Sequence, residues 1–230
     1  MPQPPILFNR CGSTTEATHS VIGENGVEGA SVDYTTGYFG NGINSNNTNK
    51  YVEFANAGDI YLGAAGTFEF WMSPYADITN GTIPAGTRSV FSMANTNNNL
   101  FDLLMSPAGI AWRIRVGGTY YGFGNTSYTP ADFDLATGAW GHVAFVWNSA
   151  GIDGGSDTCR FYFNGAKLLN TTSALTLPSS IGVLWLGSYI QASTLHANAV
   201  LDNFKIYSYA KLDFNDRFNE RGGLDDQLIT

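Results

Sequence analysis

Charged side chains are scarce in this chain of 230 residues. Asp, Glu, Lys and Arg together make up 13% of the sequence, well under the ~25% that is typical of globular proteins. The eleven Lys and Arg residues are scattered, and the formal net charge is −8. Nucleic-acid binding depends on clustered basic side chains that neutralise phosphates. The sequence therefore argues against a nucleic-acid partner and against an anionic membrane surface.

Long apolar runs are also missing. No run approaches the ~20 residues of a membrane-spanning helix, so no membrane insertion is expected. The first residues, Met1-Pro-Gln-Pro-Pro, have neither the basic nor the apolar region of a signal peptide. We expect a protein of the extracellular space or of a virion surface with no signal peptide in this chain. Assembly of a virion inside a host cell is one route that needs none.

Cysteine and histidine are too few for a metal or disulfide framework. The two cysteines, Cys11 and Cys159, leave two interpretations open: a pair of buried thiols or one long-range disulfide. Cys159 alternates with Phe161 and Phe163, so we expect it to face the core. The three histidines and two cysteines have no zinc-site spacing.

Short apolar stretches with a period of two residues dominate what the chain does contain. In the clearest hairpin, Gly117-Gly118 joins strands 110–116 and 119–123, because two glycines adopt positive φ without steric conflict. Its register pairs Val116 with Thr119, Ile114 with Tyr121, and Trp112 with Phe123. Asn164-Gly165 is a second turn signal, and residues 12–30 are expected to form a loop.

Many short strands joined by polar turns predict an all-β fold, an antiparallel two-sheet jelly-roll sandwich. No helix longer than two turns is expected, although residues 210–221 have the composition of one short helix. No change in composition divides the chain. We therefore expect a single domain over residues 1–221, followed by a flexible C-terminal tail over residues 222–230.

Six motifs in a fixed order carry a family resemblance. They are Gly37-Tyr-Phe-Gly40, Tyr51-Val-Glu-Phe54, Phe70-Trp-Met-Ser-Pro74, Trp140-Gly-His-Val-Ala144, Tyr162-Phe-Asn-Gly165 and Leu201-Asp-Asn-Phe-Lys-Ile-Tyr207. In this order they resemble the laminin-G-like domains of the concanavalin A-like lectin/glucanase superfamily. The resemblance covers nearly the whole chain and implies a concanavalin A-like sandwich that displays binding loops.

The resemblance also implies a calcium site. Related folds hold Ca²⁺ with the aspartate that matches Asp202 and with carbonyls of the first strand and the Gly-rich element, for which Asn9 and Gly40 are the candidates. Asp202 has the strand parity of Phe204 and Ile206, so we expect it to point toward the core, where a charge needs a partner or a metal. A structural, hydrogen-bonded aspartate is the alternative.

Arg113, Arg115 and Tyr120 share the other face of the hairpin and form the candidate ligand-binding group. Two guanidinium groups beside an aromatic ring suit a carboxylated or sulfated sugar. A solvated or loop-covered sheet face is the alternative. We expect the long polar loops to carry recognition and a partner or calcium to order them; these are residues 74–87, 125–139 and 148–157.

Catalysis is not expected. The glucanases of the superfamily place their carboxylates on one strand as Glu-x-Asp-x-x-Glu, and no such segment occurs here. His142 stands in the Trp-x-His-Val motif, where a packing role is expected. The first hypothesis is a non-catalytic module that binds a glycan or surface protein, with calcium shaping its loops. The second is a decoration or adhesion protein whose partner is a capsid, tail or filament subunit. A glycoside hydrolase ranks third.

Overall fold

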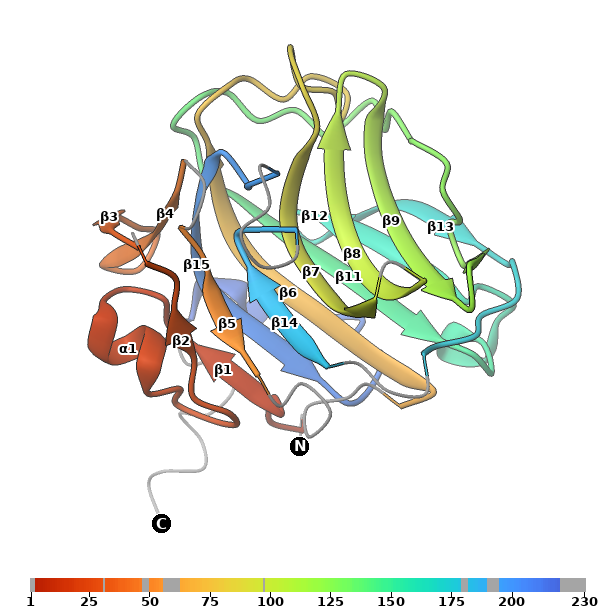
Figure 1. Ribbon diagram of the computed structural model, residues 1–230. Coiled ribbons are helices and arrows are strands. Elements are labelled where there is room, and N and C mark those ends of the chain that lie inside the picture. Colours follow the sequence, from red (N-terminus) through yellow and green to blue (C-terminus); the bar gives the residue numbers. More distant parts are fainter. Residues whose placement is uncertain are drawn as a thin grey trace.

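The computed structural model describes residues 3–30, 32–46, 50–55, 63–96, 98–178, 182–189 and 195–219. Within these ranges the chain forms two antiparallel sheets that pack face to face, which confirms the predicted sandwich (Figure 1). The expected tail, residues 222–230, lies outside the described residues. No helix in the described part of the chain is both long and apolar enough to cross a membrane.

Sheet A has the strand order β13-β12-β11-β6-β15-β4-β3, with β1 paired to β15. Its strands are β1 (Leu7–Asn9), β3 (Tyr34–Thr36), β4 (Asn41–Ser45), β6 (Ala65–Pro74), β11 (Gly141–Asn148), β12 (Cys159–Phe163), β13 (Ala166–Thr171) and β15 (Ala199–Tyr207). The last strand of the chain, β15, thus lies inside the sheet, between β6 and β4.

Sheet B has the order β10-β9-β8-β7-β14-β5-β2. Its strands are β2 (Val27–Glu28), β5 (Val52–Phe54), β7 (Arg88–Thr96), β8 (Asn99–Ser106), β9 (Gly109–Val116), β10 (Thr119–Tyr121) and β14 (Val183–Leu186). The Gly-Gly hairpin has the predicted register next to the turn, with Val116 opposite Thr119 and Ile114 opposite Tyr121. The predicted pairing of Trp112 with Phe123 was wrong, because β10 ends at Tyr121 and Gly122 has φ 64°.

In the described part of the chain, helix is limited to three short pieces, α1 (Thr14–Thr18) and the 3₁₀ turns η1 (Ile152–Gly154) and η2 (Asn215–Phe218). The prediction that residues 12–30 form only a loop was wrong, because α1 and β2 lie within them. Ser13 caps α1 by accepting a hydrogen bond from the Glu16 backbone N–H at 3.2 Å. The expected short helix near the C-terminus is present as η2.

Aromatic side chains from both sheets fill the core. Trp112 of sheet B stacks on Phe145 of sheet A with ring centroids 4.3 Å apart, and Phe68 packs against Phe91 across the same interface. Alternation of apolar residues along each strand puts one face of each sheet in this core. Cys159 belongs to it, as expected, and both cysteines are free and buried, so the interpretation of two buried thiols is confirmed.

Candidate functional site

Two of the long loops meet at one end of the sandwich, the upper end in Figure 1, which we call the loop end. The loop at 74–87 pairs with the loop at 125–139 through reciprocal backbone hydrogen bonds between Ile78 and Leu135. The Asp77 carboxylate accepts hydrogen bonds from the backbone and hydroxyl of Thr137, both at 2.7 Å. These loops therefore order one another, and no partner is needed to give them a conformation.

The third loop, residues 148–157, lies at the opposite end. Strand β11 begins with Gly141 opposite Met72, near the loop end, and finishes with Asn148 opposite Ala65. The loop that follows Asn148 is therefore a full strand length away from Pro74, roughly 25–30 Å for eight or nine residues. The three loops cannot contribute to one compact site.

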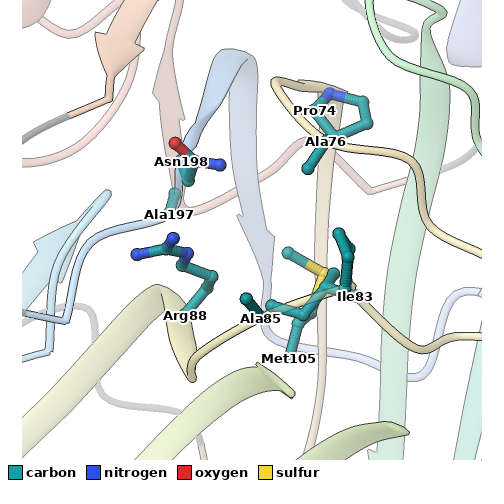
Figure 2. A pocket seen from close by; sticks show the side chains of 9 residues that line it. Pro74, Ala76, Ile83, Ala85, Arg88, Met105, Ala197 and Asn198 are labelled. Atoms are coloured by element: carbon teal, nitrogen blue, oxygen red, sulfur yellow. The ribbon is translucent and has the colours of Figure 1, made fainter. Parts of the chain in front are cut away.

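A pocket of about 100 Å³ opens at the loop end between the two sheets (Figure 2). Its lining residues are Pro74, Ala76, Ile83, Pro84, Ala85, Arg88, Met105, Ala197 and Asn198. Sheet A contributes through Pro74 and the segment that leads into β15, and sheet B contributes through Arg88 and Met105, which face each other in the β7–β8 register. Apolar walls with a few polar groups are typical of small-molecule sites.

Sequence reasoning missed this pocket. Arg88 is directly followed by the apolar strand Ser89–Met93, and no Asp or Glu occurs between residues 78 and 101. The sequence signal that could have identified it was a basic residue at the start of a buried strand with no acidic residue near it in sequence.

Asp202 is buried, with 1% of its surface exposed, but it does not face the core as predicted. It lies opposite Trp71, and Lys205 lies opposite Glu69, so two residues of β15 oppose the single position Phe70. Asn203 has φ 54° at this bulge, and the extra residue reverses the side-chain alternation. Leu201 and Phe204 consequently face the core, whereas Asp202 lies on the outer face of sheet A.

The Asp202 carboxylate accepts a hydrogen bond from the Phe39 backbone N–H at 2.7 Å. Gly37 lies directly against it, since a Cβ there would stand 2.7 Å from Asp202 Oδ2 and 2.5 Å from the Asn41 carbonyl carbon. The Gly-rich element is therefore held to β15 through this carboxylate, and close backbone approach explains the glycine.

The other two calcium candidates have protein partners. The Asn9 side chain donates to the carbonyls of Glu16 and Ala17, and the Asn9 backbone carbonyl accepts from the Cys11 thiol at 3.4 Å. The Gly40 carbonyl accepts the Gly37 N–H at 2.9 Å. Each of these two carbonyls already accepts one hydrogen bond from the protein, whereas calcium requires six to eight oxygens; calcium at Asp202 stays a prediction. Within the described residues, no group of three or more His, Cys, Asp or Glu is arranged to hold a metal.

Replacing Asp202 by Ala is expected to lower the free energy of unfolding by about 1–3 kcal/mol, because the Phe39 N–H then lacks its buried acceptor. Asp202→Asn should lower the free energy of unfolding by less, since the amide oxygen of Asn can still accept that hydrogen bond. Asp132→Asn at an exposed site is the control. Thermal unfolding in calcium and in chelator checks both roles: a rise in Tm with calcium that Asp202→Asn abolishes would establish a metal site, whereas identical Tm values would contradict it.

The predicted ligand-binding group lies together on the outer face of sheet B, with Arg115 opposite Tyr120. Arg113 forms a bidentate pair with Asp102, whose side chain is fully buried. The Arg115 guanidinium donates to the Gly118 carbonyl at 3.1 Å and lies 5.1 Å from the centre of the Tyr120 ring. The charge of Arg113 is already matched, so an acidic ligand would have to compete with Asp102. Ligand binding at this group stays a prediction.

A buried polar cluster on the outer face of sheet A was also not foreseen. Glu69 is bound by Lys211 at 2.9 Å, by the Tyr207 hydroxyl at 2.8 Å and more distantly by Lys205 at 3.8 Å. The segment 208–219 covers this cluster, and Lys211 also pairs with Asp216 at 2.9 Å. Burial alone would raise the pKa of Glu69, but Lys211, Lys205 and His142 more than offset it and lower that pKa to about 2.

His142 packs beside this cluster, as expected for a structural residue. Its ring lies 5.4 Å from that of Trp71, and its Nε2 lies 3.8 Å from Glu69. Burial is the main cause that lowers the pKa of His142 to about 3. The positive charges of Lys211 and Lys205 also lower this pKa, whereas the negative charge of Glu69 raises it. The imidazole is therefore neutral at physiological pH.

Two carboxylates share the outer face of sheet B in a row of paired residues that crosses five strands. The row runs Glu53, Trp185, Ser92, Asp102, Arg113. Glu53 and Asp102 are three strand spacings apart, roughly 14 Å at ~4.8 Å each. A glycosidase pair needs about 5–9.5 Å, so these two carboxylates are too far apart to form one.

Solved structures of similar fold include two binding domains and one domain of an arabinanase. The receptor-binding domain of botulinum neurotoxin D matches with a TM-score of 0.65 and 16% identity, over 90% of this chain and 50% of that one. A second match is domain 4 of AbnA, an extracellular arabinanase from Geobacillus stearothermophilus, which was solved with arabinotriose. Its TM-score is 0.59 and its identity 14%, over 96% of this chain and 100% of that one. The binding domain of Paraclostridial Mosquitocidal Protein 1 matches with a TM-score of 0.65 and 18% identity, over 90% of this chain and 49% of that one.

At these identities the likeness establishes the fold, and the chain spans about half the length of the two toxin domains. No curated protein matches the sequence. A family model, Laminin_G_3, described as the concanavalin A-like lectin/glucanases superfamily, matches residues 46–213. That range includes five of the six motifs and most of both sheets, so the chain belongs to the concanavalin A-like lectin/glucanase superfamily.

Proposed function

We propose that this protein is a non-catalytic recognition module that binds glycans at the loop end of its sandwich. The observation that carries the proposal is the loop-end pocket between the sheets, with apolar walls and with Arg88 and Asn198 as its polar lining. Ordered loops on a rigid sandwich offer such a site at little entropic cost, because the bound conformation exists beforehand.

The fold and its relatives support the proposal. The superfamily is one of lectins and glucanases, and the similar arabinanase domain was solved with a sugar bound. The proposal does not require calcium, since Asp202 is not among the residues that line the pocket. An extracellular or virion-surface location suits a module of this kind and is part of the proposal.

A second candidate function is a decoration or adhesion protein that contacts a capsid, tail or filament subunit. An aromatic patch on the outer side of sheet A favours it: Tyr38 stacks on Trp71 at 3.6 Å, and Phe218 lies 5.9 Å from Trp71 and is 57% exposed. Trp71 is itself 4% exposed, so the exposed ring at this site is that of Phe218, which is the candidate contact for a protein partner because aromatic side chains are enriched in protein interfaces.

A glycan array tests the first function. We expect the native protein to bind a discrete set of glycans, and Ala85→Phe, which fills the pocket from an exposed position, to lose them while keeping its Tm. Lys167→Gln on β13 is the control, since Lys167 is exposed and lies outside the pocket. Failure to bind any glycan, together with stable co-purification with a capsid or filament subunit, would favour the second function. Release of reducing sugar by the repurified protein would contradict both.

A further inference from the structure

We infer that the loop-end pocket recognises the carboxylate of an acidic sugar and that Arg88 is the residue that binds it. The inference rests on the proposed glycan-binding function and adds the ligand class and the residue that selects it. It comes from the position of Arg88, from the absence of a partner for it among the described residues, and from the size and lining of the pocket.

Arg88 occupies an inward-facing position at the mouth of the sandwich. It lies opposite Met105 in the β7–β8 pairing, so the two side chains leave sheet B on the same face, and Met105 belongs to the core. Figure 2 shows the Arg88 guanidinium close to Ala197 and Asn198, with Ile83 on the other side of the pocket. The charge is thus half-buried among apolar groups, where an isolated cation is unfavourable.

The described residues give Arg88 no hydrogen-bond acceptor and no ion-pair partner. The sequence around the pocket explains this, because no Asp or Glu occurs in residues 78–101, 103–131 or 158–201. Asp77, the nearest acidic residue along the chain, is bound to Thr137. Arg113, by contrast, has its own carboxylate in Asp102. Arg88 therefore keeps its full set of donors for a ligand.

The lining selects a carboxylate with carbon attached to it. A cavity of about 100 Å³ has roughly the volume of three liquid waters, which suits a carboxylate and its neighbouring ring atoms rather than a whole oligosaccharide. The guanidinium fork matches a carboxylate in a bidentate way. Met105, Ile83 and Pro84 would contact the apolar edge of the ring, which a bare sulfate or phosphate lacks.

The overall charge supports selection rather than indiscriminate attraction of anions. With a net charge of −8, the long-range field of the protein opposes any anion. Binding must therefore come from short-range contacts in the pocket, which only a correctly shaped acidic group makes. Sugars with a ring carboxylate, the uronic and sialic acids, have that chemistry.

The test is calorimetric titration with oligosaccharides that end in glucuronic or N-acetylneuraminic acid, beside the same oligosaccharides with the carboxylate reduced to an alcohol. We expect the native protein to prefer the acidic forms by at least about tenfold, as for other charge-assisted bidentate contacts. Arg88→Gln should abolish the preference, and Arg88→Lys should retain part of it. Lys167→Gln, which removes one positive charge elsewhere, should leave it unchanged.

The outcomes separate the inference from the function on which it rests. Equal affinity for acidic and reduced oligosaccharides, or a preference that survives Arg88→Gln, would overturn the role of Arg88 and leave glycan binding intact. Binding of no oligosaccharide of either kind would overturn the proposed function and the inference with it, as would binding of acidic peptides alone. Thermal unfolding of each variant confirms that lost binding is not lost folding.

Discussion

Replacing Glu69 by Gln is expected to lower the free energy of unfolding by about 3–5 kcal/mol, the usual effect of removing one partner from a buried ion pair. Glu69 is 2% exposed, and the side chains of Lys205 and Lys211 are 1% and 7% exposed. Without the carboxylate, two ammonium groups remain buried with too little negative charge around them. The lowered pKa of Glu69, from 4.5 to about 2, corresponds to a stabilisation on the order of 3 kcal/mol.

The same cluster makes the free energy of unfolding depend on pH. A carboxylate whose pKa is depressed in the folded state contributes fully above its unfolded value, here near 4.5, and loses that contribution as the pH falls toward 2. His142 acts over a higher window: the unfolded chain takes up its proton near pH 6.5 and the folded one only near 3, so stability declines as the pH falls through that range.

Urea unfolding between pH 3 and pH 7 measures both effects. Glu69→Gln should flatten the part of the profile below pH 4.5, whereas Glu16→Gln, at a half-exposed position with a 3.8 Å ion pair, should change stability little and leave the profile unaltered. A Glu69 variant as stable as the Glu16 control would show that the cluster adds no net stability.

The second large effect is expected at Trp112, where truncation to Ala should destabilise the fold by about 3–5 kcal/mol. The indole is 2% exposed and contacts the rings of Phe91, Phe101, Phe145 and Phe161. Two of these rings belong to sheet A, so the cavity would open between the sheets and could not close without moving one of them.

Trp112→Phe is the matched variant. It keeps a ring against Phe145 and removes the indole N–H, which has no hydrogen-bond acceptor among the described residues. We expect it to cost less than about 1.5 kcal/mol. Chemical denaturation of both variants decides the point. Similar losses for Ala and Phe would mean that a phenyl ring does not replace the packing of the larger indole, and that the ring contact with Phe145 contributes little by itself.

The local periodicity of the chain was enough to predict the sandwich and the pairs of one hairpin that lie next to its turn. Period-two alternation around Gly117-Gly118 fixes which residues pair, because the turn permits only one short connection. Asn164-Gly165 carried equal information: Asn164 and Gly165 both have positive φ, and β12 and β13 pair around them. Strand β13 was nevertheless not predicted, because Ala166–Thr171 alternates weakly.

Features that depend on distant residues were not predictable in the same way. Strands β4 and β5 follow each other around the Asn-rich segment, yet they belong to different sheets. The bulge at Asn203 shifts Asp202 to the outer face, and simple alternation cannot anticipate an inserted residue. Arg88 became a candidate only when the fold brought β6, β7, β8 and the start of β15 together around it.

The position of β15 has a consequence for how the protein is made. Strand β15, Ala199–Tyr207, is synthesised after the other described strands, yet it pairs with β6 and β4 and also with β1, where Leu7 lies opposite Ile206. Until it is synthesised, β1 has no strand partner in the described part of sheet A, and one edge of β6 is unpaired while its other edge pairs with β11.

Contacts between residues so far apart in sequence make folding slow, because the entropy of closing a long loop is lost before the contacts between its ends stabilise the chain. A nascent chain therefore cannot complete sheet A until residues 199–207 have left the ribosome, and one edge of β6 stays unpaired until then. Lys211, which follows β15 by only a few residues, then closes the outer face of the same sheet. Synthesis that stops before residue 199 is expected to yield an aggregation-prone chain rather than a smaller folded domain.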